Sequence, residues 1–263
     1  MKLSKPISME ELSKTKISLF SSLAGRKHRL RHGLFIVEGE KSVADTLGSF
    51  ELEALIVCSG FELSMINLGI LPKDKLFVTN RAGMDKISSL STSSQVAAVY
   101  KLPISSMERS DMTDKLPDAL YLMLDGIQDP GNLGTIVRTA HWFGIKRIFA
   151  SRDTVDIYNP KTIQSTMGSL AKVEVTYCDL AKLIDVNKEL PVYGLLLDGK
   201  NINDVKLGHR GFIIMGNEGK GISAELRKKV TDRLLIPPYD PSDHSESLNV
   251  AIATGITLAE FRR

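Results

Sequence analysis

Short apolar runs separated by polar stretches make up the first hundred residues. The runs predict buried strands at Leu34–Val37, Ala54–Val57, Leu76–Val78 and Val96–Tyr100. Polar stretches with helical spacing lie around them, at Ser8–Leu23, Glu40–Leu47 and Arg81–Ile87. This alternation of strand and helix is typical of an α/β domain.

The same alternation returns more strongly in the second half of the chain. Apolar runs predict strands at Leu120–Leu124, Arg147–Ala150, Val173–Tyr177, Val192–Leu197, Phe212–Met215 and Leu234–Ile236. Because these runs are apolar at nearly every position, they fit strands buried on both faces of a mostly parallel sheet. Helical spacing is clearest at Gly131–Phe143, Ala224–Val230 and Ser247–Phe261.

A segment without periodicity separates the two patterns. Lys101–Pro117 contains two prolines, three serines and charges of both signs, which is typical of a connection between domains. We therefore divide the chain into an N-terminal domain of residues 1–103, a linker of residues 104–117 and a C-terminal domain of residues 118–263. The fold class expected for both domains is α/β.

Charge changes this picture only through its distribution. The 263 residues contain 34 Lys and Arg against 31 Asp and Glu, a net charge of +3. Residues 1–32 hold eight of these bases and two of the acids, a local charge of +6, which leaves −3 for the rest. A basic segment on a near-neutral body is compatible with a polyanionic partner and excludes a uniformly basic coat. The alternative is that residues 1–32 form a solvated amphipathic helix, which would have the same local charge without binding a polyanion.

Composition and cysteine usage exclude several other classes. The hydrophobic fraction of 43% and the charged fraction of 25% are those of a globular protein. No apolar run approaches the roughly 20 residues that cross a bilayer, and Met1–Phe20 lacks a signal-peptide layout, so we expect a cytoplasmic protein without membrane partners. Cys58 and Cys178 lie far apart without a CxxC or Cys/His cluster, so we expect buried thiols, no disulfide and no metal site.

Three segments place glycine or small polar residues directly after a predicted strand, where ligands bind in open α/β sheets. In the first, Leu124–Ala140, the residues Pro130, Gly131 and Gly134 allow a tight turn. Asn132 suits a helix cap, and Arg138 follows two turns into the helix. Arg138 is by default a solvated charge, although its small neighbours would also let it point across the strand ends.

The second segment is Ile213–Ser223, with the sequence IIMGNEGKGIS. Its glycine spacing matches neither the phosphate loop, which needs Ser or Thr after the lysine, nor GxGxxG, so a nucleoside triphosphate or dinucleotide is disfavoured. The glycines still allow a ligand to approach the backbone, and Glu218 offers a carboxylate at the strand end. A simple helix-entry turn is the alternative.

The third segment is Leu234–Phe261, in which a strand leads through a polar loop to Ser247 and a helix rich in small residues. A capping role for one serine is expected, and the small residues of Ala251–Gly255 permit close packing. Asp243 and His244 are adjacent, but the chain has no GxSxG elbow, so we exclude a serine hydrolase.

The three segments in this order resemble the motifs of the SpoU/TrmH family of RNA ribose 2′-O-methyltransferases. The matching residues are Asn132-x-Gly134-x-x-x-Arg138-Thr139-Ala140, then Gly216-Asn217-Glu218-Gly219, then Ile236-Pro237 followed by Ser247-Leu248-Asn249-Val250. The resemblance covers residues 118–263. Leu34–Leu47 is similar to the start of the small ribosomal-protein-like RNA-binding domain that many members carry.

The resemblance implies a C-terminal α/β methyltransferase domain with a trefoil knot, an exception to the rule that chains avoid knots. It also implies S-adenosylmethionine as cofactor and a homodimer with its site at the subunit interface. Cofactor contacts would fall to Gly216, Asn217, Gly219, Ile236 and Leu248, mainly through backbone groups. The loop from Ile236 to Leu248 is longer than in many members, with Tyr239, Asp243 and His244 extra, so its own contacts are left open.

The catalytic residues that the resemblance implies are Asn132, Arg138, Glu218, Ser247 and Asn249. Our hypothesis is that Arg138 binds the phosphate next to the reacting ribose and stabilises the developing alkoxide, because arginine does not readily give up its proton. Asn132 would orient the ribose or Arg138, and Glu218 would hold Arg138 or another donor. Ser247 and Asn249 would complete the polar wall.

The basic segment is assigned to RNA, with Arg26, Lys27, Arg29 and Arg31 as phosphate contacts. Ribosomal RNA is favoured over transfer RNA as the substrate by the two-domain layout. A nonenzymatic RNA-binding protein with the same fold is the alternative, although the intact polar residues of the motifs argue against it.

Overall fold

The computed structural model describes residues 9–67, 71–103, 115–243 and 245–263, and it divides into two compact units. The first unit comprises Met1–Pro103 and Tyr158–Ala171, and the second comprises Ile104–Ile157 and Lys172–Arg263. Residues 158–171 therefore pack with the first unit, although they interrupt the sequence of the second. Most of the predicted linker, residues 104–114, lies outside the described residues, as do Lys2, Lys5 and His244.

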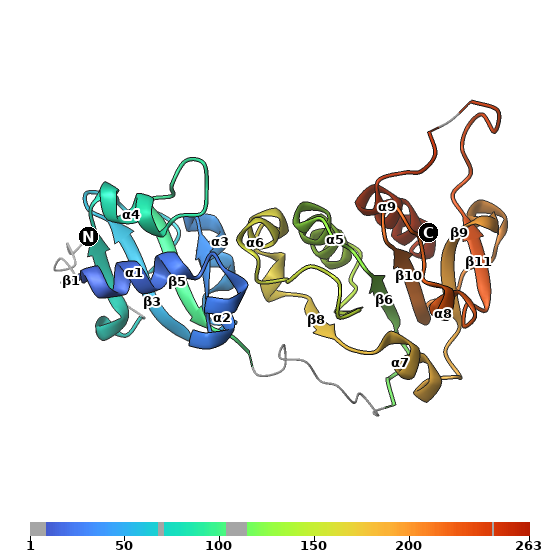
Figure 1. Ribbon diagram of the computed structural model, residues 1–263, viewed down its shortest axis with the longest axis horizontal. Helices are drawn as coiled ribbons and strands as arrows, with labels where there is room; N and C mark the ends of the chain where they lie inside the picture. The colour runs from blue at the N-terminus through green and yellow to red at the C-terminus, as the bar shows by residue number, and fades with distance from the viewer. Residues whose placement is uncertain (1–8, 68–70, 104–114, 244) are drawn as a thin grey trace, which may run out of the picture. The chain divides into compact units, whose positions relative to one another are not determined.

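The first unit is built on a five-stranded sheet in the order β1-β4-β3-β5-β2 (Figure 1). β5 runs antiparallel to both of its neighbours, whereas β1, β4 and β3 are parallel. The elements are β1 (Glu10–Glu11), α1 (Lys14–Ser22), α2 (Arg26–His32), β2 (Leu34–Glu38), α3 (Glu40–Thr46), β3 (Leu52–Cys58), the 3₁₀ turn η2 (Lys73–Lys75), β4 (Leu76–Thr79), α4 (Arg81–Ile87), β5 (Val96–Lys101), α6 (Pro160–Thr166) and the 3₁₀ turn η4 (Ser169–Ala171).

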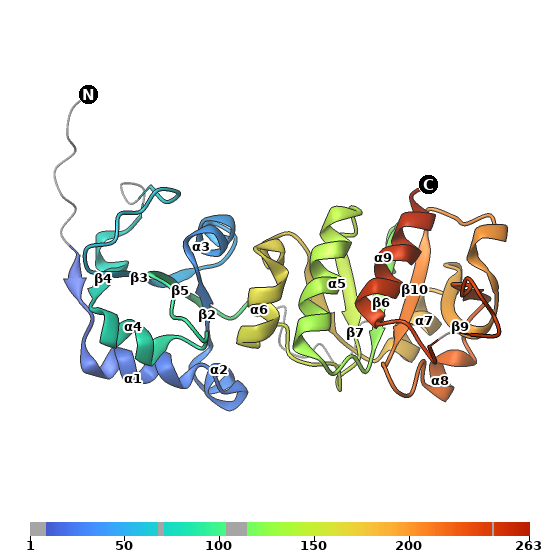
Figure 2. The same cartoon turned by 90° about the horizontal axis from the view of Figure 1, so that it is seen from above.

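The second unit is built on a six-stranded sheet in the order β11-β9-β10-β6-β7-β8, and every pair in it is parallel. Its elements are β6 (Leu120–Asp125), α5 (Pro130–Trp142), β7 (Arg147–Ala150), β8 (Glu174–Tyr177), α7 (Leu180–Val186), β9 (Val192–Asn201), the 3₁₀ turn η5 (Ile202–Asp204), β10 (Gly211–Gly216), α8 (Ala224–Arg227), β11 (Asp232–Leu235) and α9 (Val250–Phe261). Helices α5 and α9 lie side by side over one face of this sheet (Figure 2).

Each unit has its own apolar core. Core residues of the first unit come from α1, α4 and the inner strands, with Phe20, Ile56 and Phe77 almost fully buried. In the second unit the rings of Tyr121, Phe149 and Phe212 contact one another on three adjacent strands, with centroid separations of 5.6 to 6.4 Å. These contacts join β6, β7 and β10, whose carboxyl ends carry the first two motifs.

The α/β expectation is confirmed, and the predicted strands are present with ends that shift by a few residues. Both cysteines are buried and free, with Cys58 at the end of β3 and Cys178 just after β8. Burial raises the pKa of the Cys178 thiol to about 12, so that it stays protonated. No helix among the described residues is long and apolar enough to cross a membrane.

Candidate active site at the carboxyl edge of the parallel sheet

The first motif turns directly from β6 into α5. The Asp129 side chain accepts a hydrogen bond from the Asn132 backbone N–H at 2.8 Å and caps the helix, while Pro130 occupies its first turn. The helix cap is therefore Asp129, and the expectation that Asn132 caps this helix is wrong. Because Asp129 caps the helix, the Asn132 side chain is available for other contacts at the sheet edge.

The second motif closes into a tight turn beside the first. The Asn217 side-chain oxygen accepts hydrogen bonds from the N–H groups of Gly219 and Lys220, both at 3.0 Å. Its amide nitrogen donates to the Gly126 carbonyl at 2.6 Å, so the second motif is joined to the loop after β6. Gly216 is required here, because a Cβ would lie 2.4 Å from the backbone of Gly221 and Ile222.

The third motif begins α9, with Asn249 as its cap. The Asn249 Oδ1 accepts from the N–H groups of Ala251 at 2.9 Å and Ile252 at 3.3 Å. Asparagine performs the capping role that the sequence predicted for a serine. Ser247 instead lies on the wall of a cavity with an exposed side chain.

A relay of side-chain hydrogen bonds connects the three motifs. The Asn249 Nδ2 donates to the Asn132 Oδ1 at 3.0 Å, and the Asn132 Nδ2 donates to the Glu218 Oε1 at 2.9 Å. The polarity of this relay is determined at one end, because the Asn249 oxygen already faces backbone N–H groups. Asn132 must then present its oxygen to Asn249 and its N–H group to the Glu218 carboxylate.

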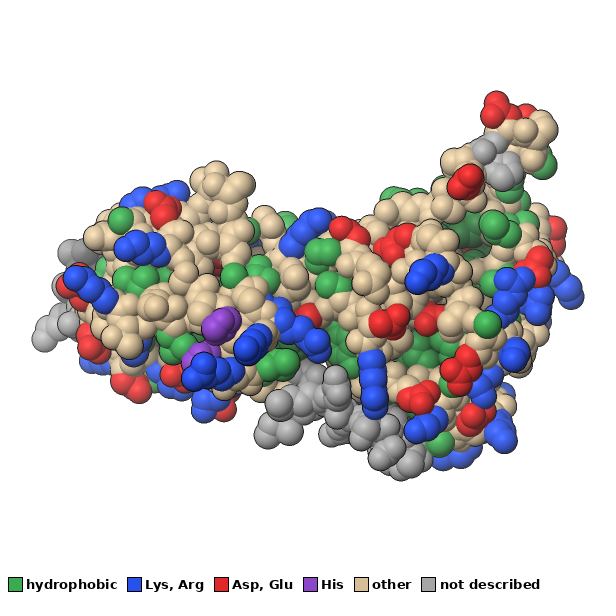
Figure 3. All heavy atoms as spheres, viewed as in Figure 1, with side chains coloured by type: hydrophobic (Ala, Val, Ile, Leu, Met, Phe, Trp, Pro, Cys, Tyr) green, Lys and Arg blue, Asp and Glu red, His purple; other side chains and the backbone are tan. Residues whose placement is uncertain are grey.

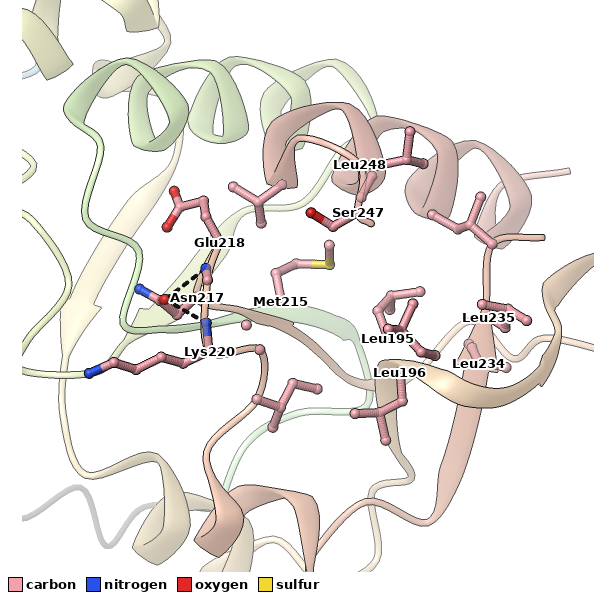
Figure 4. Close-up of a pocket in the computed structure, with 18 of the residues that line it drawn as sticks. Leu195, Leu196, Met215, Asn217, Glu218, Lys220, Leu234, Leu235, Ser247 and Leu248 are labelled. Atoms are coloured by element: carbon pink, nitrogen blue, oxygen red, sulfur yellow. Dashed lines mark hydrogen bonds between the residues drawn. The ribbon is translucent and has the colours of Figure 1, made fainter. Parts of the chain in front are cut away.

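A cavity of about 600 Å³ opens beside the relay, within the range of about 300–1,000 Å³ that is usual for small-molecule sites. Asn217, Glu218 and Lys220 gather at one end, and leucines form the other (Figure 4). The lining residues include all five predicted cofactor contacts, namely Gly216, Asn217, Gly219, Ile236 and Leu248. The cavity therefore combines an apolar end with a polar end.

Arg138 lies apart from this relay. Asn132 and Arg138 are six residues apart on α5, which places their side chains about 120° apart around the helix axis. Arg138 is exposed, and among the residues that the structure describes none forms a hydrogen bond or ion pair with its guanidinium group. Of the two partners expected for Glu218, the described chain therefore pairs it with another donor, Asn132, and not with Arg138.

The predicted RNA-binding residues lie on α2, where Lys, Arg and His side chains gather on one face of the molecule (Figure 3). Arg26, Lys27 and Arg31 are exposed. Arg29 is only 2% exposed, and its Nη1 donates to the carbonyls of Leu23 at 2.9 Å and Ala24 at 2.8 Å. The expectation for Arg29 is therefore wrong, because its guanidinium group holds the turn between α1 and α2 and is not presented to a ligand.

Sequence reasoning missed two carboxylates of the site region. The Asp125 Oδ2 accepts from the Ser223 N–H at 2.7 Å and joins the end of β6 to the start of α8. Asp198 lines the cavity from β9. Both follow predicted strands directly, which is the signal that would have identified them.

A parallel α/β sheet with a small-molecule cavity at its carboxyl edge and a polar relay beside that cavity is typical of a ligand-binding enzyme domain. Residues 119–259 match the SpoU rRNA Methylase family, and residues 14–98 match the MRM3-like substrate binding domain. The chain belongs to the SpoU rRNA methylase family and is an RNA methyltransferase by class, which confirms the resemblance.

Two relatives match almost the whole of this chain. The 23S rRNA (guanosine(2553)-2′-O)-methyltransferase RlmP of Bacillus subtilis is 30% identical over 260 residues, which cover 97% of this chain and 98% of RlmP. The structure of a Porphyromonas gingivalis protein assigned to the TrmH family of RNA methyltransferases superposes with a TM-score of 0.82 at 36% identity, over 95% of this chain and 98% of that one.

The AdoMet-bound rRNA methyltransferase of Sinorhizobium meliloti superposes with a TM-score of 0.79 at 25% identity, over 97% of this chain and 96% of that one. These similarities confirm the fold class. The knot depends on how the last segment passes through an earlier loop, and it stays a prediction.

Proposed function

We propose that this protein transfers a methyl group from S-adenosylmethionine to a ribose 2′-hydroxyl of ribosomal RNA. The observation that carries the proposal is the relay of Glu218, Asn132 and Asn249, which reaches the polar end of a cavity with an apolar wall through Glu218. The named substrate of the Bacillus subtilis relative, 23S rRNA, supports ribosomal over transfer RNA.

The residues around the cavity fit this cofactor. Leu195, Met215 and Leu234 provide an apolar surface suited to the adenine ring, and at Gly216 the backbone itself forms the wall because no Cβ can be accommodated. Gly216, Asn217, Gly219, Ile236 and Leu248 would hold the cofactor, largely through main-chain groups. Bound there, S-adenosylmethionine supplies an electrophilic methyl group on its sulfonium sulfur.

The chain's own task is to position the ribose and to stabilise the charge that develops on it. Asn132, held between Glu218 and Asn249, has a determined orientation and can direct the 2′-hydroxyl toward the cavity. The Ser247 side chain adds a further polar group to the lining of the cavity. Arg138 would bind the neighbouring phosphate and stabilise the alkoxide, for which its permanent charge is suited.

We further propose a homodimer. Trp142 is 85% exposed and lies one turn after Arg138 on α5, while the adjacent helix α9 exposes Ile252 at 56%. Such an apolar face on two helices is suited to a second copy of the chain. Association there would bury Arg138 at the interface and bring it to a site that two chains complete.

RNA would dock on the N-terminal unit through Arg26, Lys27 and Arg31 of α2. Since the relatives reported above come from bacteria, whose ribosomes are assembled in the cytoplasm, we propose that location for the protein.

The direct test measures S-adenosylmethionine binding by calorimetry, with NAD as the comparison, and methyl transfer into ribosomal and transfer RNA. In Asn132→Asp the new carboxylate cannot donate to Glu218 and repels it, so we expect methyl transfer to fall by about 10²-fold, the effect of losing one oriented donor. Asn203→Asp, the same charge change at an exposed position of the second unit, is the control.

Three outcomes would contradict the proposal. Failure of the wild-type protein to bind S-adenosylmethionine would remove the cofactor assignment. Binding without methyl transfer to any RNA would favour a nonenzymatic RNA-binding protein. Full activity in Arg138→Ala beside loss in Asn132→Ala would contradict the role given to Arg138. Loss of a 2′-O-methyl mark in total RNA from a deletion strain would identify the nucleotide.

A further inference from the structure

One strand of the second unit leaves its sheet beside the cavity. On β11, the neighbours Arg233 and Leu234 pair with Gly194 and Lys200 of β9, so five residues of β9 lie outside the ladder. We call Leu195–Gly199 the β9 bulge. Four of its members, Leu195 to Asp198, line the cavity, so the position of this bulge sets the shape of one cavity wall.

The bulge ends at Gly199, where the neighbouring backbone leaves no room for a side chain. A Cβ on Gly199 would lie 2.4 Å from the carbonyl carbon of Leu234. The Gly199 backbone therefore lies close against Leu234, while the segment before it has no ladder partner on β11. Side-chain contacts contribute to the position of that segment.

Asp198 makes those contacts with two arginines at once. Its Oδ2 accepts from the Arg227 Nη2 at 2.8 Å and from the Arg233 Nη1 at 2.7 Å. Arg227 ends α8, which follows the second motif, and Arg233 lies on β11, which leads into the third. A single carboxylate thus connects the bulge to the element that follows the second motif and to the strand that precedes the third.

The arrangement contributes little to the stability of the fold, because all three side chains are 45 to 47% exposed and exposed ion pairs are weak. Its effect is local. Without the carboxylate, two guanidinium groups lie close together with no opposing charge, and repulsion between them would separate α8 from β11 at the cavity wall.

We propose that Asp198 is a positioning residue for cofactor binding: by holding Arg227 and Arg233 together it fixes the β9 bulge in the conformation that shapes the cavity. The inference rests on the proposed function, since it takes S-adenosylmethionine as the occupant. Asp198 acts through the wall and not on the reacting atoms, so its loss weakens cofactor binding without slowing the chemical step.

The test compares Asp198→Asn with Asp185→Asn in the full-length protein. Asp185 forms a similar ion pair with Lys229 at 2.6 Å on the same unit, but neither residue lines the cavity. We expect Asp198→Asn to raise the Kd and KM for S-adenosylmethionine by about 10-fold while kcat at saturation stays within about 2-fold, the pattern of lost ground-state binding. We expect Asp185→Asn to keep the Kd, KM and kcat of the wild-type protein, and both variants to keep its thermal midpoint.

A double-mutant cycle tests whether the effect passes through the arginine. Arg233 does not line the cavity, so Arg233→Met weakens binding only by way of Asp198, and its effect disappears in the Asp198→Asn background. An unchanged Kd in Asp198→Asn, or a fall in kcat at constant KM, overturns the inference alone. A wild-type protein that does not bind S-adenosylmethionine overturns the proposed function as well.

Discussion

Arg29 and Arg31 lie two residues apart on the basic helix α2, yet they occupy opposite environments. Arg31 is exposed, whereas the guanidinium group of Arg29 is buried and donates to two carbonyls in the turn between α1 and α2. At the residue scale, the same side chain is thus a candidate phosphate contact at one position and a structural donor at the other. Burial alone distinguishes the two.

This difference predicts unequal costs for the same substitution. Arg29→Met removes a charged donor from two carbonyls, so we expect the free energy of unfolding to fall by about 2–3 kcal/mol. Arg31→Met makes the same change in charge at an exposed position and stays within about 0.5 kcal/mol of wild type. Urea denaturation measures both, and equal stability of the two variants would contradict the structural role of Arg29.

At the scale of elements, α2 is a complete helix and not an irregular basic stretch. Gly33 ends it with a left-handed φ of 64°, a conformation that glycine adopts without strain. The helical period places Arg26, Lys27 and Arg31 within an arc of about 140°, with Arg29 outside that arc. A rigid arc of cations is suited to the phosphates of a folded RNA.

Replacing these three exposed cations with alanine should weaken RNA binding. Each lost phosphate contact lowers the slope of log K against log salt by about 0.7–0.9, so the triple variant should lose about 2 to 3 of that slope. The matched control replaces Lys73, Arg81 and Lys86, which are exposed elsewhere on the same unit. Filter binding across a salt series measures the slope for each triple variant. If the two slopes are equal, the α2 cluster is only a solvated surface.

At the scale of the whole molecule, the exposed apolar face of α5 and α9 is unusual beside the well-packed cores of the two units. Trp142 on α5, with Ile252 and Ile256 on α9, belongs to the few large hydrophobic side chains that the described chain exposes. A second copy of the chain would cover them. Arg138, on the same side of α5 as Trp142, would be covered with them.

Trp142→Glu places a charge on this face, and we expect it to convert the protein from dimer to monomer in light scattering. Since the proposed site needs two chains, methyl transfer should fall together with dimer content. Met65→Glu, at another exposed apolar residue in the first unit, is the control and should remain dimeric and active. A monomeric wild-type protein with full activity would contradict the proposal.

The strands other than β1, which falls inside the helix predicted at Ser8–Leu23, and the long helices were predictable because their signals are local. Each strand of the second sheet contains an apolar run, and α5 and α9 have enough turns for their spacing to be recognised. The helices α2, α6 and α7, of seven residues each, were missed, although α3 and α4 of the same length were predicted, because two turns carry too little periodicity to identify such helices consistently. Asn159 and Asp179, which cap α6 and α7, were the signals available for those two.

The sequence by itself determined the α/β class, the three motifs and the family, since each depends on residue type and spacing along the chain. Only the tertiary structure decided which of these residues meet. Asn132 contacts Glu218 and Asn249, which lie 86 and 117 residues further along, whereas Arg138 on the same helix contacts neither. Such contacts, like the burial of Arg29, depend on how distant elements pack, and local spacing carries no record of that packing.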